Sequence, residues 1–362
     1  MQIGIVGLPN VGKSTFFNAL TRAGAGAENY PFCTIDPNIG VVTVPDKRLD
    51  DIYKIYGSKD KTPTSIEFVD IAGLVKGASM GEGLGNQFLA HIREVDAIAQ
   101  VVRCFSDTDV PHVDGSIDPV RDIEIINTEL IMADLTTIEN RMEKTQKAAK
   151  SGEKEYLLEL EELNSLKNTL EKGKNIRQLD LDKKKEHLCR ELNLLSAKPI
   201  IYIANVDEDY MDFDNELVKE VRDHVTVDRA EVMTISARIE ADIAELDSDE
   251  ARLFLEDMGL NESGLDRVIR ASYNLLDLIT FFTGNEKEVR AWTITRGATA
   301  PEAAGRVHTD MQRGFIRAEV INYPDLMSAG SISQARDKGM LRLEGKDYIV
   351  KDGDICLFRF NV

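Results

Sequence analysis

A short motif near the start of the chain places glycine, lysine and serine at a spacing that can bind a phosphate group. Residues 7–14 read Gly-Leu-Pro-Asn-Val-Gly-Lys-Ser, which fits the pattern G-x-x-x-x-G-K-[ST]. The glycines let successive backbone N–H groups turn toward phosphate oxygens, and Lys13 places a positive charge beside them. The Ser14 hydroxyl can ligate Mg²⁺. The pattern predicts a bound nucleoside triphosphate rather than an empty glycine-rich turn. Its expected contacts are Asn10, Val11, Gly12, Lys13, Ser14 and Thr15.

The segments around this motif have the order that places a phosphate at a helix N-terminus. Residues 3–6 are an apolar run suited to a buried strand, and residues 14–20 begin a helical pattern. Further strands are expected at residues 40–44, 65–70, 97–103, 199–204 and 231–235. Short apolar runs that alternate with helical stretches predict an α/β domain built on a mostly parallel sheet.

A second motif, D-x-x-G, begins at Asp70, 56 residues after Ser14 and directly after an expected strand. An aspartate there can orient Mg²⁺ through water, and Gly73 lets its N–H approach the γ-phosphate. Upstream, Thr34 is either a second hydroxyl ligand of Mg²⁺ or an ordinary loop threonine, and Cys33 beside it is a buried spectator rather than a reactive thiol. Residues 76–85 contain four glycines, which indicates either a switch segment or a merely flexible loop. We therefore expect Lys13, Asp70 and Gly73 to be catalytic and Ser14 and Thr34 to hold the metal.

The base-reading segment should follow the strand that ends at residue 204. GTPases carry N-K-x-D there, whereas this chain has Asn205-Val206-Asp207-Glu208, without the lysine and with glutamate in place of the last aspartate. Guanine recognition depends on where that carboxylate lies, whereas asparagine can pair with adenine N6 and N7. The backbone of Val206 and the segment Ser236-Ala237 should contact the base. ATP is therefore expected in preference to GTP; a GTPase with relaxed base specificity is the alternative.

Two further residues bear on hydrolysis. Leu74 stands where Ras-like GTPases have a glutamine that orients the attacking water, so intrinsic hydrolysis should be slow. His112 is a candidate for positioning that water, against a plain surface histidine. Asn10 could also hold a monovalent cation, such as potassium, beside the phosphates.

The middle and the end of the chain differ from the α/β region. Residues 122–195 contain no proline and carry apolar residues at 3–4 residue spacing, which predicts an antiparallel coiled-coil hairpin rather than helices packed on the sheet. One stripe comprises Ile123, Ile126, Leu130 and Ala133; the other comprises Leu160, Leu163, Leu166 and Leu170. Residues 278–362 read as strands at 289–294, 315–320 and 355–360 around one helix at 301–311, a small α+β domain.

Composition limits the cellular setting. No run of about 18 apolar residues is present, the N-terminus leads straight into the first strand, and four separated cysteines lack C-x-x-C spacing. These features predict a reduced cytoplasmic protein that does not enter a membrane. The net charge is −19, but residues 201–277, with 7 basic and 21 acidic residues, supply −14 of it. An RNA-containing partner is therefore compatible with the rest of the chain.

Taken together, these motifs resemble the Obg-like ATPases, the YchF family of P-loop NTPases, over the whole chain. The segments 7–15, 29–34, 70–78 and 205–208 carry the resemblance, and residues 345–354 are similar to the end of TGS domains, which are small β-grasp modules. The resemblance implies a P-loop GTPase-like Rossmannoid fold (residues 1–121 and 198–277), a coiled-coil insertion (122–197) and a TGS domain (278–362). It also implies ATP preference, a hydrophobic residue in place of the catalytic glutamine, and association with ribosomes.

The expected function is a Mg²⁺-dependent switch that binds ATP and hydrolyses it slowly, with the coiled-coil arm and the TGS domain facing a ribosome. The alternatives are a nucleotide-gated adaptor or chaperone-like protein whose hydrolysis is incidental, a GTPase, and a metabolic kinase. The residues do not indicate an oligomeric state.

Overall fold

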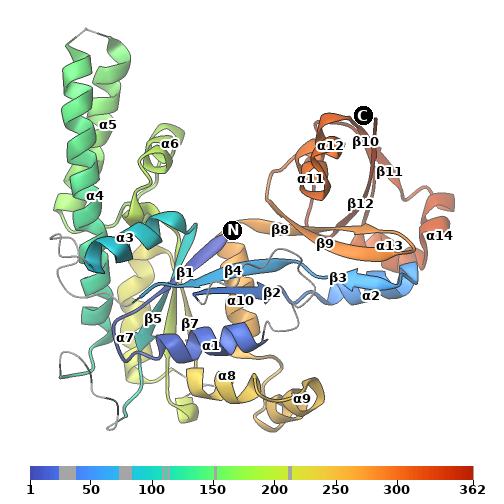
Figure 1. Ribbon diagram of the computed structural model, residues 1–362, viewed down its shortest axis with the longest axis horizontal. Coiled ribbons are helices and arrows are strands. Elements are labelled where there is room, and N and C mark those ends of the chain that lie inside the picture. The colour runs from blue at the N-terminus through green and yellow to red at the C-terminus, as the bar shows by residue number, and fades with distance from the viewer. Residues whose placement is uncertain are drawn as a thin grey trace. The chain divides into compact units, whose positions relative to one another are not determined.

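The computed structural model describes residues 1–23, 38–72, 84–107, 110, 112, 115–150, 153–210 and 214–361. The described residues form two compact units (Figure 1). The first comprises residues 1–23, 38–40 and 67–268 with the gaps given above, and the second comprises residues 41–66 and 269–361.

The first unit is built around a six-stranded sheet with the strand order β2-β4-β1-β5-β6-β7. β1 pairs in parallel with β4 and with β5, and β6 pairs in parallel with β5 and with β7. Every residue of β5 is buried, as expected for a strand covered on both faces. The strands are β1 (Gln2–Val6), β2 (Ile39–Thr43), β4 (Ser65–Asp70), β5 (Ala97–Arg103), β6 (Ile200–Asn205) and β7 (Glu231–Ile235). The predicted α/β architecture is confirmed.

Helices lie between these parallel strands, as crossover connections require. They are α1 (Lys13–Ala23), α3 (Leu84–Glu94), α4 (Pro119–Ala149), α5 (Lys154–Glu171), α6 (Lys183–Glu191) and α7 (Glu216–Val225). After β7 follow α8 (Ala237–Ile243), α9 (Ser248–Asp257) and α10 (Gly264–Leu275), and the chain passes to the second unit within α10. Within the described residues, none of these helices combines the length and the apolar character that a bilayer crossing needs.

Helices α4 and α5 form the predicted antiparallel hairpin and run side by side (Figure 1). α4 begins at Pro119, behind the N-cap Asp118, whose side chain accepts a hydrogen bond from the backbone N–H of Arg121. The predicted stripe of α5 faces α4, because Leu163 and Leu166 are fully buried in an apolar cluster with Ile131 and Ile138 of α4. The predicted stripe of α4 is wrong as a contact with α5: Ile126 and Leu130 are fully buried but do not belong to that cluster. The helical hairpin is therefore confirmed, but α4 turns a different face to α5 than the spacing predicted.

Polar contacts fix the register of the two helices. The Arg141 guanidinium lies 2.6 Å from the Glu159 carboxylate, and Lys167 lies 2.8 Å from Glu139. These partly exposed pairs are worth little stability individually. They specify which turns of α4 and α5 face each other.

A buried polar cluster joins the base of the hairpin to the sheet. Arg177, in the turn after α5, donates to Asn127 of α4 at 2.6 Å and pairs with Asp228 at 3.3 Å. Tyr202 of β6 and Gln178 also donate to Asp228, at 2.7 and 2.6 Å. Burial acts to raise the pKa of Asp228, but the Arg177 charge and these hydrogen bonds outweigh it and hold that pKa below its usual range.

The second unit contains a mixed six-stranded sheet with the order β11-β10-β12-β8-β9-β3. Its strands are β3 (Asp60–Thr62), β8 (Leu278–Gly284), β9 (Glu288–Thr295), β10 (Phe315–Asn322), β11 (Arg342–Glu344) and β12 (Asp354–Phe360). Its helices are α2 (Lys47–Tyr56), α11 (Ala300–Val307), α12 (Thr309–Arg313), α13 (Tyr323–Ala329) and α14 (Ile332–Asp337). The predicted α+β character is confirmed, but the helix expected at 301–311 is two helices, because His308 has extended backbone (φ −161°, ψ 141°).

The contents of this unit differ from the expected domain boundaries. Residues 41–66, which the sequence analysis places in the NTPase domain, belong to the second unit. β3 pairs in parallel with β9, and Leu49 and Ile52 of α2 are buried in the same apolar cluster as Phe282 of β8. The α+β unit is thus completed by a segment more than 200 residues earlier in the chain.

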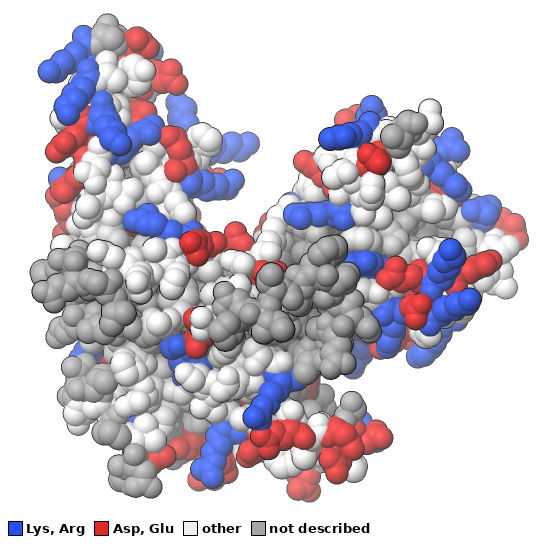
Figure 2. Space-filling model, in the orientation of Figure 1, with Lys and Arg blue, Asp and Glu red and all other residues white. Residues whose placement is uncertain are grey.

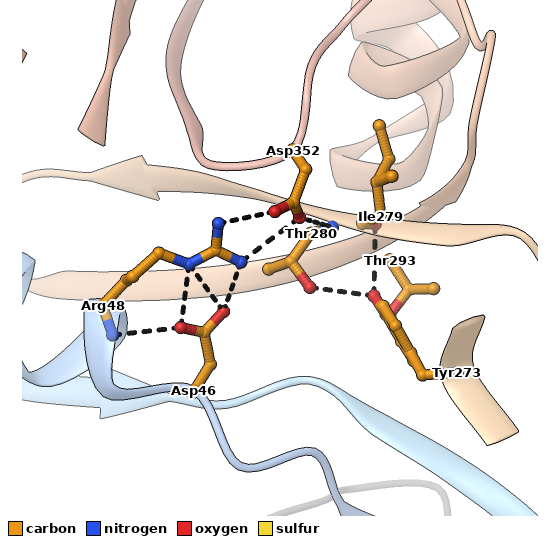
Figure 3. A network of polar contacts seen from close by, with 7 residues as sticks. All are labelled: Asp46, Arg48, Tyr273, Ile279, Thr280, Thr293 and Asp352. Carbon is orange, nitrogen blue, oxygen red and sulfur yellow. Dashed lines mark hydrogen bonds and ion pairs between the residues drawn. The ribbon is translucent and has the colours of Figure 1, made fainter. Parts of the chain in front are cut away.

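Arg48 is the centre of the polar network that holds this segment (Figure 3). Its guanidinium binds Asp46 at 2.8 Å and Asp352 at 2.7 Å. Asp352 also accepts a hydrogen bond from the backbone N–H of Thr280, at 3.0 Å. Burial acts to raise the pKa of Asp352, but the bonds from Arg48 and Thr280 outweigh it and lower that pKa. Arg48 therefore fastens the start of α2 to β8 and to the turn before β12.

Replacing Arg48 with methionine should destabilise the second unit by about 1–2 kcal/mol, because Asp352 and Asp46 lose their shared cationic partner. Urea unfolding followed by the fluorescence of Trp292 measures this change, since Trp292 is the only tryptophan and lies on β9. The native pKa of Asp352 is lowered, so the wild-type protein should lose stability as the pH falls below about 4, and Arg48→Met should lose less.

Lys61→Met is the matched control, because Lys61 pairs with Asp50 on the same segment but both side chains are about half exposed. That substitution should change the unfolding free energy by less than about 0.5 kcal/mol. Equal effects of the two substitutions would contradict the role given to Arg48.

Candidate functional site

The parallel sheet of the first unit brings five chain segments to one edge. Because parallel strands end at the same edge, the segments after β1, β4, β5, β6 and β7 meet there. A cavity of about 1080 Å³ opens at this edge. Its lining residues are Leu8, Pro9, Asn10, Gly12, Lys13, Ser14, Thr15, Phe105, Ser106, Asp107, Val110, Asn205, Val206, Asp207, Glu208, Asp209, Ser236, Ala237 and Arg238.

The loop between β1 and α1 has the backbone shape that a phosphate cradle needs. Asn10 and Gly12 have positive φ angles of 64° and 91°. A Cβ atom at Gly7 would come within 2.9 Å of the Val101 carbonyl oxygen, and one at Gly12 would collide with the Asn205 amide. Glycine is therefore required at both positions, at Gly7 for close approach and at Gly12 also for its φ angle.

Lys13 and Asp70 form an ion pair at the floor of this loop. Both side chains are largely buried, 12% and 20% exposed, while Ser14 and Thr15 are exposed toward the cavity. The structure thus brings together Lys13, Ser14 and Asp70, three residues that the sequence predicted for phosphate and metal. Phosphate binding by Lys13 must weaken its pair with Asp70, because the ammonium group then turns toward phosphate oxygens.

Asn205 has a different orientation from the one expected. Its side-chain Nδ2 donates to the carbonyl oxygen of Val11 at 3.0 Å, and its Oδ1 accepts from the backbone N–H of Ala237 at 2.9 Å. The side chain is only 5% exposed. Asn205 therefore joins the phosphate loop to the segment after β7, and the amide group expected to pair with adenine is already bonded on both sides.

The carboxylates that follow Asn205 also have protein partners. Asp207 accepts a hydrogen bond from the backbone N–H of Ser106 at 3.1 Å. Glu208 lies 3.4 Å from the guanidinium of Arg238. Val206 is only 3% exposed, and its backbone N–H donates a hydrogen bond to the carbonyl oxygen of Ile235. The four residues 205–208 thus connect the segments after β1, β5 and β7.

The segment after β5 contributes residues that the sequence analysis missed. Phe105, Ser106, Asp107 and Val110 line the cavity. Arg103, 1% exposed, donates to the carbonyl oxygens of Phe105 and Asp107, and its guanidinium lies 4.4 Å from the centre of the Phe105 ring. Their position after a central parallel strand is the signal that could have identified them.

His112 is not among the residues that line the cavity. Its Nε2 lies 2.8 Å from the carboxylate of Asp122 in the first turn of α4, and both side chains are 3% exposed. The alternative of a surface histidine is therefore wrong. The candidate role in positioning water requires His112 to leave Asp122.

Thr34, Gly73, Leu74 and Cys33 lie outside the described residues. Within the described part, no group of three His, Cys, Asp or Glu side chains could hold a metal ion. Ser14 and Asp70 offer oxygen donors beside the phosphate loop, which suits Mg²⁺ that takes most of its remaining ligands from phosphate and water.

Replacing Asn205 with aspartate tests its position as a link. The carboxylate would face the Val11 carbonyl without a proton to donate, so ATP and GTP affinity should both fall about 10- to 100-fold, with little change in their ratio. Thermal stability without nucleotide should fall as well. Calorimetric titration with each nucleotide and a melting curve measure these effects; a selective loss of ATP with unchanged melting would instead indicate base reading.

Comparison with known proteins agrees with this geometry. A family model described as a 50S ribosome-binding GTPase matches residues 2–141. A model for the C-terminal domain of YchF GTPases, described as a protein of unknown function, matches residues 278–361.

Two curated relatives and two solved structures are similar along the whole chain. The Ribosome-binding ATPase YchF of Bacillus subtilis is 53% identical over 364 residues, with 100% of both chains covered. The protein of that name from Haemophilus ducreyi is 55% identical over 361 residues, covering 100% of this chain and 99% of the relative. The YchF GTPase of Schizosaccharomyces pombe has a TM-score of 0.91 at 37% identity, covering 99% of this chain and 97% of that one. A GTP-binding protein from Pyrococcus horikoshii, 21% identical with full coverage of both chains, shares the fold with a TM-score of 0.61. The chain belongs to the YchF family.

Proposed function

We propose that this protein is an ATPase that binds ribosomes and hydrolyses ATP to ADP and phosphate as a slow switch. The observation that carries the proposal is the cavity formed by the phosphate loop and residues 205–209, in a chain 53% identical over its full length to a ribosome-binding ATPase. The positive φ angles at Asn10 and Gly12 and the exposed Ser14 suit a triphosphate. A metabolic kinase is disfavoured, because the insertion is a helical hairpin rather than a lid over the cavity.

The contacts of residues 205–208 support ATP over GTP. Guanine recognition needs a carboxylate that can accept from N1–H and the 2-amino group. Here the Asp207 carboxylate bonds to Ser106, and Glu208 pairs with Arg238. A guanine base would have to compete with both partners, whereas the adenine 6-amino group needs only an acceptor, which a backbone carbonyl oxygen beside the cavity-lining Val206 can supply. A GTPase with relaxed base specificity remains the second candidate, since the related solved structure carries the name GTPase.

Each residue of the phosphate site has one task in this proposal. Lys13 leaves Asp70 and stabilises charge on the β- and γ-phosphates. The Ser14 and Thr34 hydroxyls would hold Mg²⁺, which supplies electrostatic stabilisation of the phosphates, while Asp70 orients the metal's water and Gly73 offers its backbone N–H. Asn10, whose backbone is in the left-handed region, is the proposed site for a potassium ion.

Because the side chain of leucine at position 74 cannot form a hydrogen bond, another group must position the attacking water. Val110, which lines the cavity, lies only two residues before His112 in the sequence. We infer that ATP binding releases His112 from Asp122 for this purpose.

The proposed ribosome contact is the end of the helical hairpin. Residues 141–158 carry five basic and three acidic residues in a chain of net charge −19. Lys144, Lys147, Lys150 and Lys154 are exposed there, and none forms an ion pair within the described part of the chain. Blue side chains gather at the free end of α4 and α5 (Figure 2). Such lysines suit a phosphate backbone.

ATP hydrolysis measured with and without purified ribosomes tests the function. We expect slow ATP turnover, slower GTP turnover, and stimulation by ribosomes of at least about tenfold (a ΔΔG‡ of about 1.4 kcal/mol). An adaptor with incidental hydrolysis would not respond to ribosomes.

Lys13→Ala should abolish activity, and His112→Ala should reduce the rate more than tenfold (about 1.4 kcal/mol) with unchanged ATP affinity. Full activity of His112→Ala would remove that residue from the mechanism.

Charge reversal at Lys144, Lys147 and Lys150 should weaken co-sedimentation with ribosomes by at least about tenfold at moderate salt, because three phosphate-directed charges change sign. Basal ATP hydrolysis should not change. The matched control is charge reversal at Lys172, Lys174 and Lys183. These lysines follow the end of α5, whereas the tested lysines lie at the free end of the hairpin, where α4 ends and α5 begins. Equal losses in both sets would indicate a non-specific charge effect rather than an arm-tip contact.

A further inference from the structure

One face of the sheet in the second unit is only partly covered. Ala318, Val320, Cys356 and Phe358 point into an apolar cluster that includes residues of α11. Ile321 and Ile355 point to the other face, into a cluster with α2, α13 and α14. Because side chains alternate along a strand, the residues two and four positions from Ile321 and Ile355 lie on this second face.

The covering helices stop before these next positions. Glu319 of β10 is directly opposite Leu343 of β11 and Leu357 of β12. Leu343 is 66% exposed and Leu357 is 45% exposed. The next row consists of Arg317 opposite Arg359, and both are exposed. Two leucines and two arginines in adjacent rows are thus exposed on this face, next to the buried row of Ile321 and Ile355.

The charge of this surface is positive. Glu319 is 14% exposed and lies between Arg359, at 3.0 Å, and Arg336 of α14, at 3.4 Å. Arg317 has no ion pair within the described part of the chain. Three arginines therefore face one shielded glutamate.

We propose that the bare rows, namely Arg317, Glu319, Leu343, Leu357 and Arg359 with Arg336, dock an acidic protein surface of the ribosome that also presents apolar side chains. This inference rests on the proposed ribosome association and specifies which kind of ribosomal surface the second unit binds. The arginines match acidic side chains, and the leucines need an apolar counterpart that a phosphate backbone does not offer. RNA-binding sheets stack bases on aromatic rings, and these rows contain none.

Site-specific cross-linking on purified ribosomes identifies the occupant. The full-length protein carries p-benzoylphenylalanine in place of Leu343 and is irradiated on ribosomes. We expect a cross-linked product that survives ribonuclease, is destroyed by protease, and contains an acidic ribosomal protein. The same amino acid in place of Leu253, which is 58% exposed on α9 of the first unit, is the matched control and should cross-link at background level. A ribonuclease-sensitive product, or background cross-linking at position 343, would overturn the proposal.

Affinity measurements separate this inference from the proposed function. Leu343→Asp, Leu357→Asp and Arg317→Glu should each weaken ribosome co-sedimentation at least tenfold, with Trp292 fluorescence and basal ATP hydrolysis unchanged, whereas Leu253→Asp should have no effect. If these three variants sediment like the wild type, the docking surface is wrong while the function stands. If the wild-type protein itself does not sediment with ribosomes, the proposed association fails, and this occupant fails with it.

Discussion

The nucleotide site depends on the parallel pairing of β1 with β4 and β5, continued through β6 and β7. Parallel strands end at a common edge, so segments from distant parts of the chain meet there. Lys13 and Asp70, 57 residues apart, can form an ion pair only because β1 and β4 are neighbours. An antiparallel pairing would send Asp70 to the opposite edge and leave the phosphate loop without its acidic partner.

Within this edge, hydrogen bonds between loops matter as much as the groups that would touch a ligand. Asn205 bonds to Val11 and Ala237, Asp207 bonds to Ser106, and Arg103 holds the carbonyl groups of its own loop. The side chains of Asn205 and Asp207, which line the cavity, use polar atoms in these bonds that could otherwise contact a base. Hydrogen bonds that join these loops to one another reduce the ordering entropy that nucleotide binding costs.

Sequence patterns predicted the strands of the first sheet and the helical hairpin well, because both are local periodicities. The phosphate loop was predictable for the same reason: its spacing is contiguous. Orientation was not predictable, since nothing near Asn205 in the chain indicates that Val11 accepts its amide hydrogen. His112 is a similar case, because its partner Asp122 lies across a turn into α4. The sequence also did not indicate that α2 and β3 belong to the second unit, since their partners Phe282 and Glu288–Arg290 are more than 200 residues away.

That last segment affects how the two units are connected. The chain passes from the first unit to the second within β2 and returns within β4, immediately before Asp70. Between these points lie α2 and β3, which Arg48 and the pairing of β3 with β9 fasten to the second unit. The strand that ends at the acidic residue of the phosphate site is thus continuous with a segment that the second unit holds by packing and by ion pairs. The backbone of β4 is therefore the direct covalent connection between Asp70 and the segment that completes the second unit.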